Sequence, residues 1–371
     1  MLRREPKRQP TSPTRPRAPE ISERDWDSFV AAHPHGHLLQ TRHWGKLKNA
    51  HGWKATHASI ATTQGRLAGA SLTLLRGLPY GLGRLAYVPR GPVVDWDRPE
   101  LVEPILNATC RQAKKNGAMA VVIEPDLFDT PSDRALLQKH GFAELDFTVQ
   151  PPRTVLINLD VDEDVDILTA MKQKTRYNVG LAKRKGVVVR VGDLADVATF
   201  HSMMEVTTER KAFGAHGLNY YENFQRLFSK DDGGRPGDAA RLFVAEHEGE
   251  PLAGLIATAV GKTAIYLYGA STNHKRELMA PYLLQWEAMQ WARNKGCLTY
   301  DMWGVPDADE TTLEANFEQR NDALWGVYRF KRGFGGQVVR HIGAWVRVLS
   351  PLRWRLYGLA RKLRKTTGLG G

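Results

Sequence analysis

Two stretches of the chain follow the same pattern: Arg111-Gln112-Ala113-Lys114-Lys115-Asn116-Gly117 runs into Ala118–Ile123, and Gln290-Trp291-Ala292-Arg293-Asn294-Lys295-Gly296 runs into Cys297–Met302. Basic residues in a last helical turn, with glycine directly after it, are features that end an α-helix. The short apolar run that follows is typical of a buried strand. Each stretch therefore predicts a helix followed at once by a strand, in two copies about 180 residues apart.

The segments before each helix also recur. Each half begins with a pattern typical of a β-hairpin with a tight turn, and a further strand pattern follows before the helix. The predicted strands are Trp53–Ile60, Leu67–Leu75 and Gly83–Val88 in the first half, and Leu242–His247, Leu252–Val260 and Thr263–Tyr268 in the second. Hairpin, strand, helix and strand is the order of an acyl-CoA N-acetyltransferase core. We therefore predict an α/β (α+β) fold of two tandem acetyltransferase-like (GNAT-type) domains, an analogy that concerns fold and not function.

The turn with which that fold holds coenzyme A is missing from both halves. Acetyltransferases bind the pyrophosphate on bare amides of a glycine-rich turn at a helix N-terminus. The first candidate turn, residues 89–93, has one glycine between two prolines, which lack N–H donors. The second, residues 276–281, has no glycine. We therefore expect no coenzyme A, and a transferase with this fold would use a different acyl donor. We expect no other cofactor either.

The positive charge is concentrated at the two ends of the chain. Of the net charge of +12, residues 1–20 carry +4 and residues 340–371 carry +8, so residues 21–339 are balanced. Basic ends favour contact with a polyanion such as RNA or a phosphate-rich membrane face. The five prolines among residues 1–20 equally fit a disordered, solubilising tail, which we assign to residues 1–22.

Further features bear on where the protein works. No signal peptide and no apolar run long enough to span a bilayer is visible, which predicts a cytoplasmic protein. Cys110 and Cys297 lack metal-ligand spacing and are expected to be reduced, buried thiols. His33, His35 and His37 alternate in a loop without partner residues, so we predict no metal site.

Two basic helices are also predicted. Leu168–Lys185 places apolar residues on one stripe and Lys or Arg around the rest. In Ser350–Lys365, serine caps the helix, proline opens it, and Leu352, Leu356, Leu359 and Leu363 form one stripe. This leucine stripe could pack on the first domain, which we expect, or lie with the basic face on an anionic membrane. The same charges could instead attract RNA.

Four segments, in order along the chain, resemble motifs of the Fem (FemABX) peptidyltransferase family. They are Leu38–Lys48, Met171–Asn178 with Lys185-Gly186, Ala280–Trp286 with Tyr300–Val305, and Val327–Gly336. The resemblance covers about residues 25–345. It implies two acetyltransferase-like domains, with the C-terminal stretch returning to the first. We therefore expect the first domain to comprise residues 23–158 and 335–371, and the second residues 159–334. The short segment 220–242 leaves no room for the coiled-coil arm of some members, so the chain resembles the armless form.

The resemblance also implies an activity. Fem enzymes move an amino acid from aminoacyl-tRNA to a stem-peptide amine of a peptidoglycan precursor, building the cross-bridge. Both substrates are rich in phosphate, for which Lys and Arg are suitable ligands. By motif position, Lys48 resembles the residue of the first domain that holds the precursor diphosphate, with Lys46 as the second choice. Arg210 resembles its partner from the second domain. The acceptor could be UDP-linked or lipid-linked.

The resemblance places the reaction at other residues. Lys331 resembles the lysine that positions the tRNA acceptor end and stabilises the oxyanion. Glu124, at a strand end before Pro125, matches an acidic position and could take a proton from the attacking ammonium. Tyr268 ends a predicted strand and could line the pocket or pack in the core.

Three other readings of the sequence remain open. The basic segments also fit a tRNA-binding or other nucleic-acid-binding protein without catalysis, although the balanced charge of residues 21–339 disfavours wide wrapping of nucleic acid. The fold also fits an acyl-CoA-dependent N-acyltransferase. The last helix alone could make this a structural protein at a membrane. Convergence of Lys48, Arg210 and Lys331 on one cleft would favour the transferase, and we expect such an enzyme to be a monomer.

Overall fold

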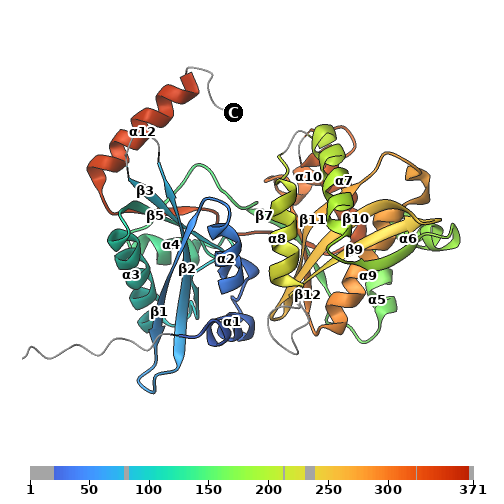
Figure 1. Cartoon of the computed structure of the whole chain (residues 1–371). Helices are drawn as coiled ribbons and strands as arrows, with labels where there is room; N and C mark the ends of the chain where they lie inside the picture. Colours follow the sequence, from blue (N-terminus) through green and yellow to red (C-terminus); the bar gives the residue numbers. More distant parts are fainter. Residues whose placement is uncertain (1–20, 79–82, 212–213, 230–238, 323, 367–371) are drawn as a thin grey trace, which may run out of the picture.

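The computed structural model describes residues 21–366 apart from 79–82, 212–213, 230–238 and 323. It consists of two mixed sheets, each covered by helices and placed side by side (Figure 1). Residues 1–20, which make up nearly all of the predicted basic tail, lie outside the described residues.

The first sheet has the strand order β1-β2-β3-β5-β14-β6, with β4 added on β2. β3 and β5 are parallel and are joined by helix α3, which covers one face of the sheet. The other face is covered by α1, η1 and α2. The bounds are α1 Glu23–Ala32, η1 Leu38–Gln40, α2 Arg42–Asn49, β1 Lys54–Ala61, β2 Leu67–Gly77, β3 Arg84–Pro89, β4 Val93–Val94, α3 Pro99–Lys115, β5 Ala118–Glu124, α4 Pro131–Lys139, β6 Ala143–Glu144 and β14 Trp345–Val348.

The second sheet has the order β13-β7-β12-β11-β10-β9-β8. Here the parallel pair is β11 and β12, joined by α9. The bounds are β7 Arg153–Asn158, α5 Asp164–Ala170, α6 Gln173–Arg184, β8 Val188–Gly192, α7 Asp196–Lys211, α8 Leu218–Phe228, β9 Ala240–His247, β10 Glu250–Val260, β11 Thr263–Ser271, η3 Arg276–Leu278, α9 Ala280–Asn294, β12 Thr299–Gly304, α10 Glu310–Asn316, α11 Trp325–Lys331, η4 Arg332–Phe334 and β13 Gln337–Arg340. The last helix, α12 Pro351–Thr366, follows β14 and contacts β5 of the first sheet.

The predicted duplication is confirmed. Strands β1, β2 and β3 with α3 and β5 repeat as β9, β10 and β11 with α9 and β12. Gly117 and Gly296, with φ of +78° and +80°, follow the two helices, a conformation that costs glycine little. The fold is thus a pair of tandem acetyltransferase-like domains, and the described residues contain no helical-hairpin arm.

The boundary between the sheets differs from the predicted one. Strand β7, which we placed in the first domain, pairs with β12 on one side and β13 on the other, both in the second sheet. The chain then crosses back, because β14 pairs with β5 and β6 in the first sheet. The chain therefore leaves the first domain before Arg153 and returns to it only after Arg340. The backbone pairing of β7, β13 and β14 determines the domain boundary, and the apolar patterns of these strands do not indicate it.

The predicted helix Leu168–Lys185 is two helices, α5 and α6. Met171 between them has φ −69° and ψ 151°, an extended conformation. The next backbone N–H, that of Lys172, donates to the carbonyl of Gly333 at 2.9 Å instead of to a helical carbonyl. A contact from the far end of the domain therefore interrupts a pattern that locally favours one helix.

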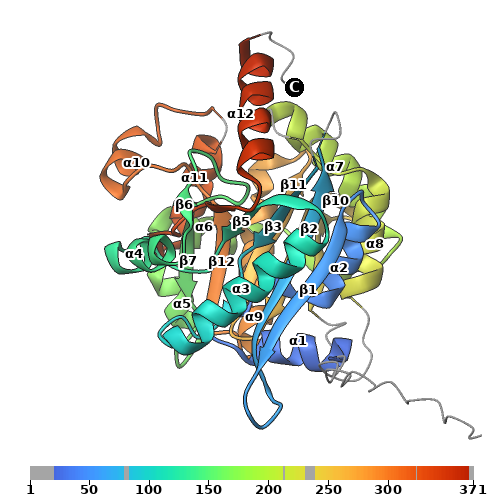
Figure 2. The ribbon, with the colours of Figure 1, turned by 90° about the vertical axis from the view of Figure 1, so that its left-hand side faces the viewer.

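One apolar core joins the two domains. Buried side chains of α1, η1 and β2, such as Trp26, Leu39 and Leu72, belong to the same cluster as Phe200 of α7 and Phe224 of α8. Two further cores lie between α3 and the first sheet and between α9 and the second. The turned view shows α12 rising from this body instead of lying along it (Figure 2). Because the interface is apolar and shared, it holds residues of both domains in fixed relation.

Candidate functional site

A cavity of about 510 Å³ opens in the second domain, where its parallel strands separate. Only Thr263–Ile265 of β11 pair with β12, where their partners are Thr299–Asp301. Beyond that point they diverge, and Tyr266–Ser271 faces Trp303-Gly304 across the gap. The corresponding pair in the first domain, β3 and β5, stays paired over its whole length. The other residues that line the cavity are Pro151, Met204, Thr207, Arg276, Pro281, Leu324, Gly326, Val327, Phe330 and Lys331.

Lys331 lies in the wall of this cavity at the end of α11. It is only 5% exposed, and its Nζ donates to the carbonyls of Trp303 at 3.1 Å and Gly304 at 2.8 Å. Burial lowers the pKa of Lys331 to about 7, an effect that the charge of Asp301 opposes. Two donors of the amine are therefore occupied, and protonation near neutral pH decides whether the third position is a donor or a lone pair.

The two carbonyls reach Lys331 because Trp303 adopts a left-handed conformation, with φ +61°. Asp301 accepts the N–H of Trp303 at 2.6 Å and also a hydrogen bond from the hydroxyl of Thr154. Burial raises the pKa of the Asp301 carboxyl. A non-glycine residue in this region of backbone space costs free energy and persists only where its surroundings hold it, as these bonds do. Asp301 and Trp303 therefore set the position of the Lys331 amine.

Arg90 of the first domain completes this arrangement. It is buried, its guanidinium lies 5.4 Å from the Trp303 ring, and it donates to the carbonyl of Pro151 at 2.9 Å. Arg90 was not predicted as a site residue, because residues 89–93 were considered only as a turn for coenzyme A. Its signal was an arginine between Pro89, which ends β3, and Pro92, which precedes β4; this pattern alone does not distinguish a buried cation from an exposed one.

The tyrosine hydroxyls of the domain interface link Lys48 to the same cavity. Lys48 Nζ donates to the hydroxyl of Tyr220 at 3.2 Å, and that hydroxyl lies 3.2 Å from the hydroxyl of Tyr268, which lines the cavity. The ammonium also lies 4.7 Å from the Trp44 ring. Burial lowers the pKa of Lys48 to about 8. The structure thus links Lys48 at the domain interface, through the two tyrosine hydroxyls, to the cavity that Tyr268 and Lys331 line.

The remaining predicted residues are placed as follows. Arg210 lies in the last turn of α7, the helix that supplies Met204 and Thr207 to the cavity wall, and its side chain is not among the parts that the structure describes. Lys46 is exposed and pairs with Glu23 at 2.6 Å, on another side of α2 from Lys48. Lys48 is therefore the better placed of the two lysines.

Glu124 occupies a different position from the one expected of a proton acceptor. Its carboxylate accepts hydrogen bonds from the Tyr87 hydroxyl at 2.5 Å and from the backbone N–H groups of Val149 at 2.5 Å and Gln150 at 2.9 Å. Glu124 is not among the residues lining the cavity. Burial raises the pKa of the Glu124 carboxyl above its ordinary value, and the three hydrogen-bond donors oppose this shift only in part. Because both oxygens already accept hydrogen bonds, this geometry favours a role in anchoring the segment at Val149-Gln150, which leads from the first sheet to β7 of the second.

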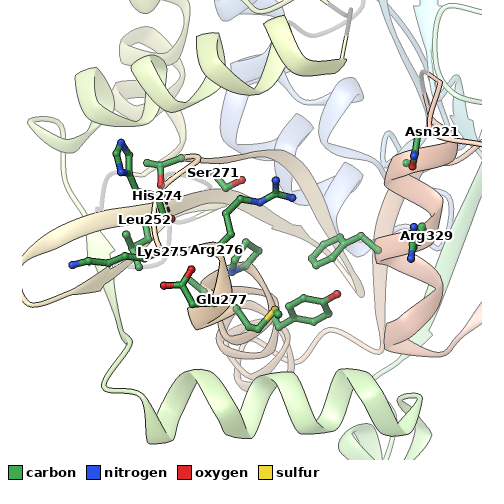
Figure 3. A pocket seen from close by; sticks show the side chains of 15 residues that line it. Leu252, Ser271, His274, Lys275, Arg276, Glu277, Asn321 and Arg329 are labelled. Atoms are coloured by element: carbon green, nitrogen blue, oxygen red, sulfur yellow. Dashed lines mark hydrogen bonds between the residues drawn. The ribbon is translucent and has the colours of Figure 1, made fainter. Parts of the chain in front are cut away.

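A second cavity, of about 630 Å³, adjoins the first at the N-terminus of α9. The two share Ser271, Arg276, Pro281, Gly326 and Phe330. Figure 3 shows His274, Lys275 and Arg276 on one wall and Asn321 and Arg329 on the opposite one. Lys275 is paired with Glu250 at 2.8 Å. The basic residues and the helix N-terminus make this cavity suitable for a phosphate-bearing chain.

In the part of the chain that is described, no three His, Cys, Asp or Glu residues lie close enough to hold a metal ion. Of the histidine triplet, His37 accepts the N–H of Leu39 at 3.1 Å, and the ring of His35 lies 3.0 Å from the carbonyl of Asp126. Cys110 and Cys297 are free and buried.

Comparison with known proteins identifies the family of the chain. A sequence model of the FemAB family matches residues 21–233 and 237–362. The chain belongs to the FemAB family. It is 25% identical over 408 residues to the lipid II:glycine glycyltransferase of Staphylococcus epidermidis (strain ATCC 35984), covering 93% of this chain and 95% of that protein. It is 26% identical over 411 residues to the enzyme of the same name from Staphylococcus aureus (strain USA300), covering 91% and 94%.

Solved structures agree on the fold. The crystal structure of FemX superposes with a TM-score of 0.80 at 23% identity, covering 91% of this chain and 98% of FemX. The match of the FemAB sequence model confirms the family prediction, and the FemX structure confirms the fold. Because the matches span nearly the full length of chains named as transferases, this FemAB protein is an enzyme of the transferase class.

Proposed function

We propose that this FemAB protein is an aminoacyltransferase, which moves an amino acid from aminoacyl-tRNA to the stem-peptide amine of a lipid-linked peptidoglycan precursor. The observation that carries the proposal is that two cavities meet at Arg276 and Phe330, beside Lys331. One leads to the basic wall at α9 and the other to the tyrosines that hold Lys48. Two phosphate-bearing substrates could therefore reach one buried amine from different sides.

The reaction is an aminolysis. The acceptor amine attacks the ester carbonyl, the C–N bond forms, the C–O bond to the tRNA ribose breaks, and the ribose hydroxyl leaves with a proton. The ester is already activated, so the step needs no ATP, no metal and no covalent enzyme intermediate. It needs placement of the two substrates and stabilisation of the oxyanion. Lys331, with two donors held by carbonyls, can direct its third N–H at that oxygen.

The donor is assigned to the cavity at α9. Arg276 and Arg329 lie on opposite walls, so a single nucleotide strand could pass between them (Figure 3). The acceptor is assigned to the domain interface, where Lys48 would hold the diphosphate. The lipid-linked form is favoured because the two staphylococcal relatives are named for lipid II.

The decisive experiment incubates the whole chain with tRNAs charged with different amino acids and with either the lipid-linked or the UDP-linked precursor. We expect the mass of the lipid-linked precursor to rise by one amino-acid residue with at least one charged tRNA. Acetyl-CoA in place of the tRNA serves as the control and should add nothing, which also tests the acyl-CoA alternative. No product from any charged tRNA with either precursor would exclude the proposed function.

The C-terminal helix supports a lipid-linked acceptor. The expectation that its leucines pack on the first domain is wrong for Leu352, Leu356 and Leu359, which are 71%, 45% and 60% exposed. The side chain of Leu363 lies outside the described part of the structure. Trp354 and Tyr357, on another face of α12, make the contact with the core instead. The helix rises from the body in both views (Figures 1 and 2). No helix in the described part of the chain is both long and apolar enough to cross a bilayer.

An exposed leucine stripe beside arginines suits the surface of an anionic membrane. Each buried leucine contributes about 1.5–3 kcal/mol, and each Lys or Arg near the surface about 1 kcal/mol. Residues 340–371 carry eight Lys or Arg and no Asp or Glu, so they do not repel such a surface. We therefore include peripheral contact with the inner membrane leaflet in the proposal.

We expect the whole chain to co-sediment with vesicles containing an anionic phospholipid at low salt, and to be released at high salt. The triple variant Leu352→Ser, Leu356→Ser and Leu359→Ser should stay in the supernatant. It keeps Trp354 and Tyr357, so the helix remains attached to the core, and an unchanged Tm controls for folding. Equal sedimentation of the two proteins, or none by either, would remove the membrane from the proposal.

A further inference from the structure

Helix α6 presents an exposed basic surface beside the turn that carries Lys331. Residues 167–192 contain seven Lys or Arg and no Asp or Glu. Thr175, Val179 and Ala182 are buried against the second domain, and the opposite face is exposed. The exposed residues that we call the α6 surface are Lys174, Arg176, Tyr177, Lys183, Arg184 and Lys185.

The charges of this surface are only partly neutralised. Lys183 lies 3.5 Å from Glu287, and Arg176 donates to backbone carbonyls. Among the described residues, no carboxylate lies within ion-pair distance of Lys174, Arg184 or Lys185. Tyr177 is 59% exposed, and the Arg184 guanidinium lies 5.7 Å from the centre of its ring. An exposed aromatic ring among unpaired cations is a combination that proteins use to bind nucleic-acid strands.

The α6 surface is connected directly to the reacting end of the site. The N–H of Lys172, at the start of α6, donates to the carbonyl of Gly333, two residues after Lys331. A Cβ on Gly333 would come within 2.3 Å of the Thr175 hydroxyl, so the turn and the helix are in close contact. Lys172 and Arg332 also share Glu314. From this junction α6 runs for about 18 Å, given 12 residues at 1.5 Å each.

We propose that the α6 surface binds the phosphate backbone of the donor tRNA next to its single-stranded acceptor end. The inference rests on the proposed function and adds a second contact, outside the cavities. RNA is favoured over a lipid surface because this face lacks the exposed leucines that α12 presents, while its charge and its ring match phosphates and bases. The surface gives the enzyme affinity for any tRNA body, because backbone phosphates carry no sequence information.

The test compares the double variant Arg184→Glu and Lys185→Glu with the wild-type chain, using both full-length aminoacyl-tRNA and a short aminoacylated RNA that lacks the stem. We expect the KM for the full-length donor to rise about tenfold or more, with the salt dependence of binding reduced by about one or two charges. The ratio of the two KM values should fall toward one. The control is Lys114→Glu with Lys115→Glu, which reverses two exposed lysines in the last turn of α3 on the other domain.

The outcomes separate this inference from the function itself. If the wild-type chain transfers no amino acid, the proposed function fails, and binding of uncharged tRNA by the variant still tests the α6 surface. If the wild-type chain is active and the α6 variant keeps the KM of the wild type, the inference is wrong. Equal losses in the α3 control, or loss of vesicle binding instead of tRNA binding, would also overturn it.

Discussion

Replacing Lys331 by methionine should slow turnover at saturating precursor by roughly tenfold to a thousandfold, with precursor affinity nearly unchanged. The amine of Lys331 lies between the Trp303 and Gly304 carbonyls in the wall of the cavity, and its cationic form has a third N–H beyond these two hydrogen bonds. Methionine has similar length but no donor. In the proposed mechanism, the change therefore removes an interaction with the oxyanion that exists only in the transition state. Single-turnover kinetics with aminoacyl-tRNA measures this step.

Folding of the variant must be checked, because two carbonyls lose a donor. The one hydrogen of the Thr154 hydroxyl is shared between Asp301 and the Trp303 carbonyl at 3.1 Å, so it replaces only part of the lost hydrogen bonding. An intact Tm with unchanged precursor affinity shows that the site is still formed. Turnover equal to that of the wild type under those conditions would rule out a role for Lys331 in the reaction.

The pH dependence of turnover distinguishes a Lys331 amine that donates to the oxyanion from one that accepts a proton. The pKa of Lys331 is lowered to about 7, so the cationic form, with its third N–H, is lost as the pH rises through that value. We therefore expect the ratio of wild-type to Lys331→Met turnover to fall between about pH 6 and about pH 8. Taking the ratio cancels the ionisation of the attacking amine, which both proteins share. A ratio that rises over this range would instead make Lys331 the proton acceptor.

Replacing Lys48 by alanine should weaken precursor binding by roughly 10- to 150-fold, with a smaller effect on the chemical step. Loss of one charge-assisted contact to a diphosphate costs about 1.5–3 kcal/mol. The amine is half-buried between Trp44 and Tyr220, which lowers its pKa to about 8. Wild-type affinity should accordingly fall as the pH rises above about 8, because the ammonium is lost. Calorimetric titration with the precursor gives both quantities.

Lys46 supplies the matched control on the same helix. It is exposed and paired with Glu23, so Lys46→Ala should leave precursor affinity within about twofold of the wild type. Arg210→Ala, chosen from the sequence motif, is expected to behave like Lys48→Ala. Unchanged affinity in both Lys48→Ala and Arg210→Ala would refute the assignment of the diphosphate site.

Much of the fold could be predicted because its signals are local. The glycines that end α3 and α9, and the apolar runs of β5 and β12, act within about ten residues of each other. The prediction that the chain does not bind coenzyme A was likewise local, because it rested only on the absence of a glycine-rich turn. Lys48 and Lys331 were named from motifs and Tyr268 from a strand end. Lys48 lies at the domain interface, and Tyr268 and Lys331 line the cavity.

Only the tertiary structure decided how these residues work, because the deciding contacts join distant segments. Lys48 donates a hydrogen bond to Tyr220, which lies 172 positions away in the sequence, and Lys331 donates one to Trp303, which lies 28 positions away. The break at Met171 depends on Gly333, the assignment of β7 depends on its pairing with β12, and the occupied carboxylate of Glu124 depends on Val149 and Gln150. A helical wheel shows that the leucines of α12 form a stripe, but not whether anything covers them. Burial, desolvation and partners are properties of the packed chain, so only the folded protein could show which cations are buried and which apolar face is left open.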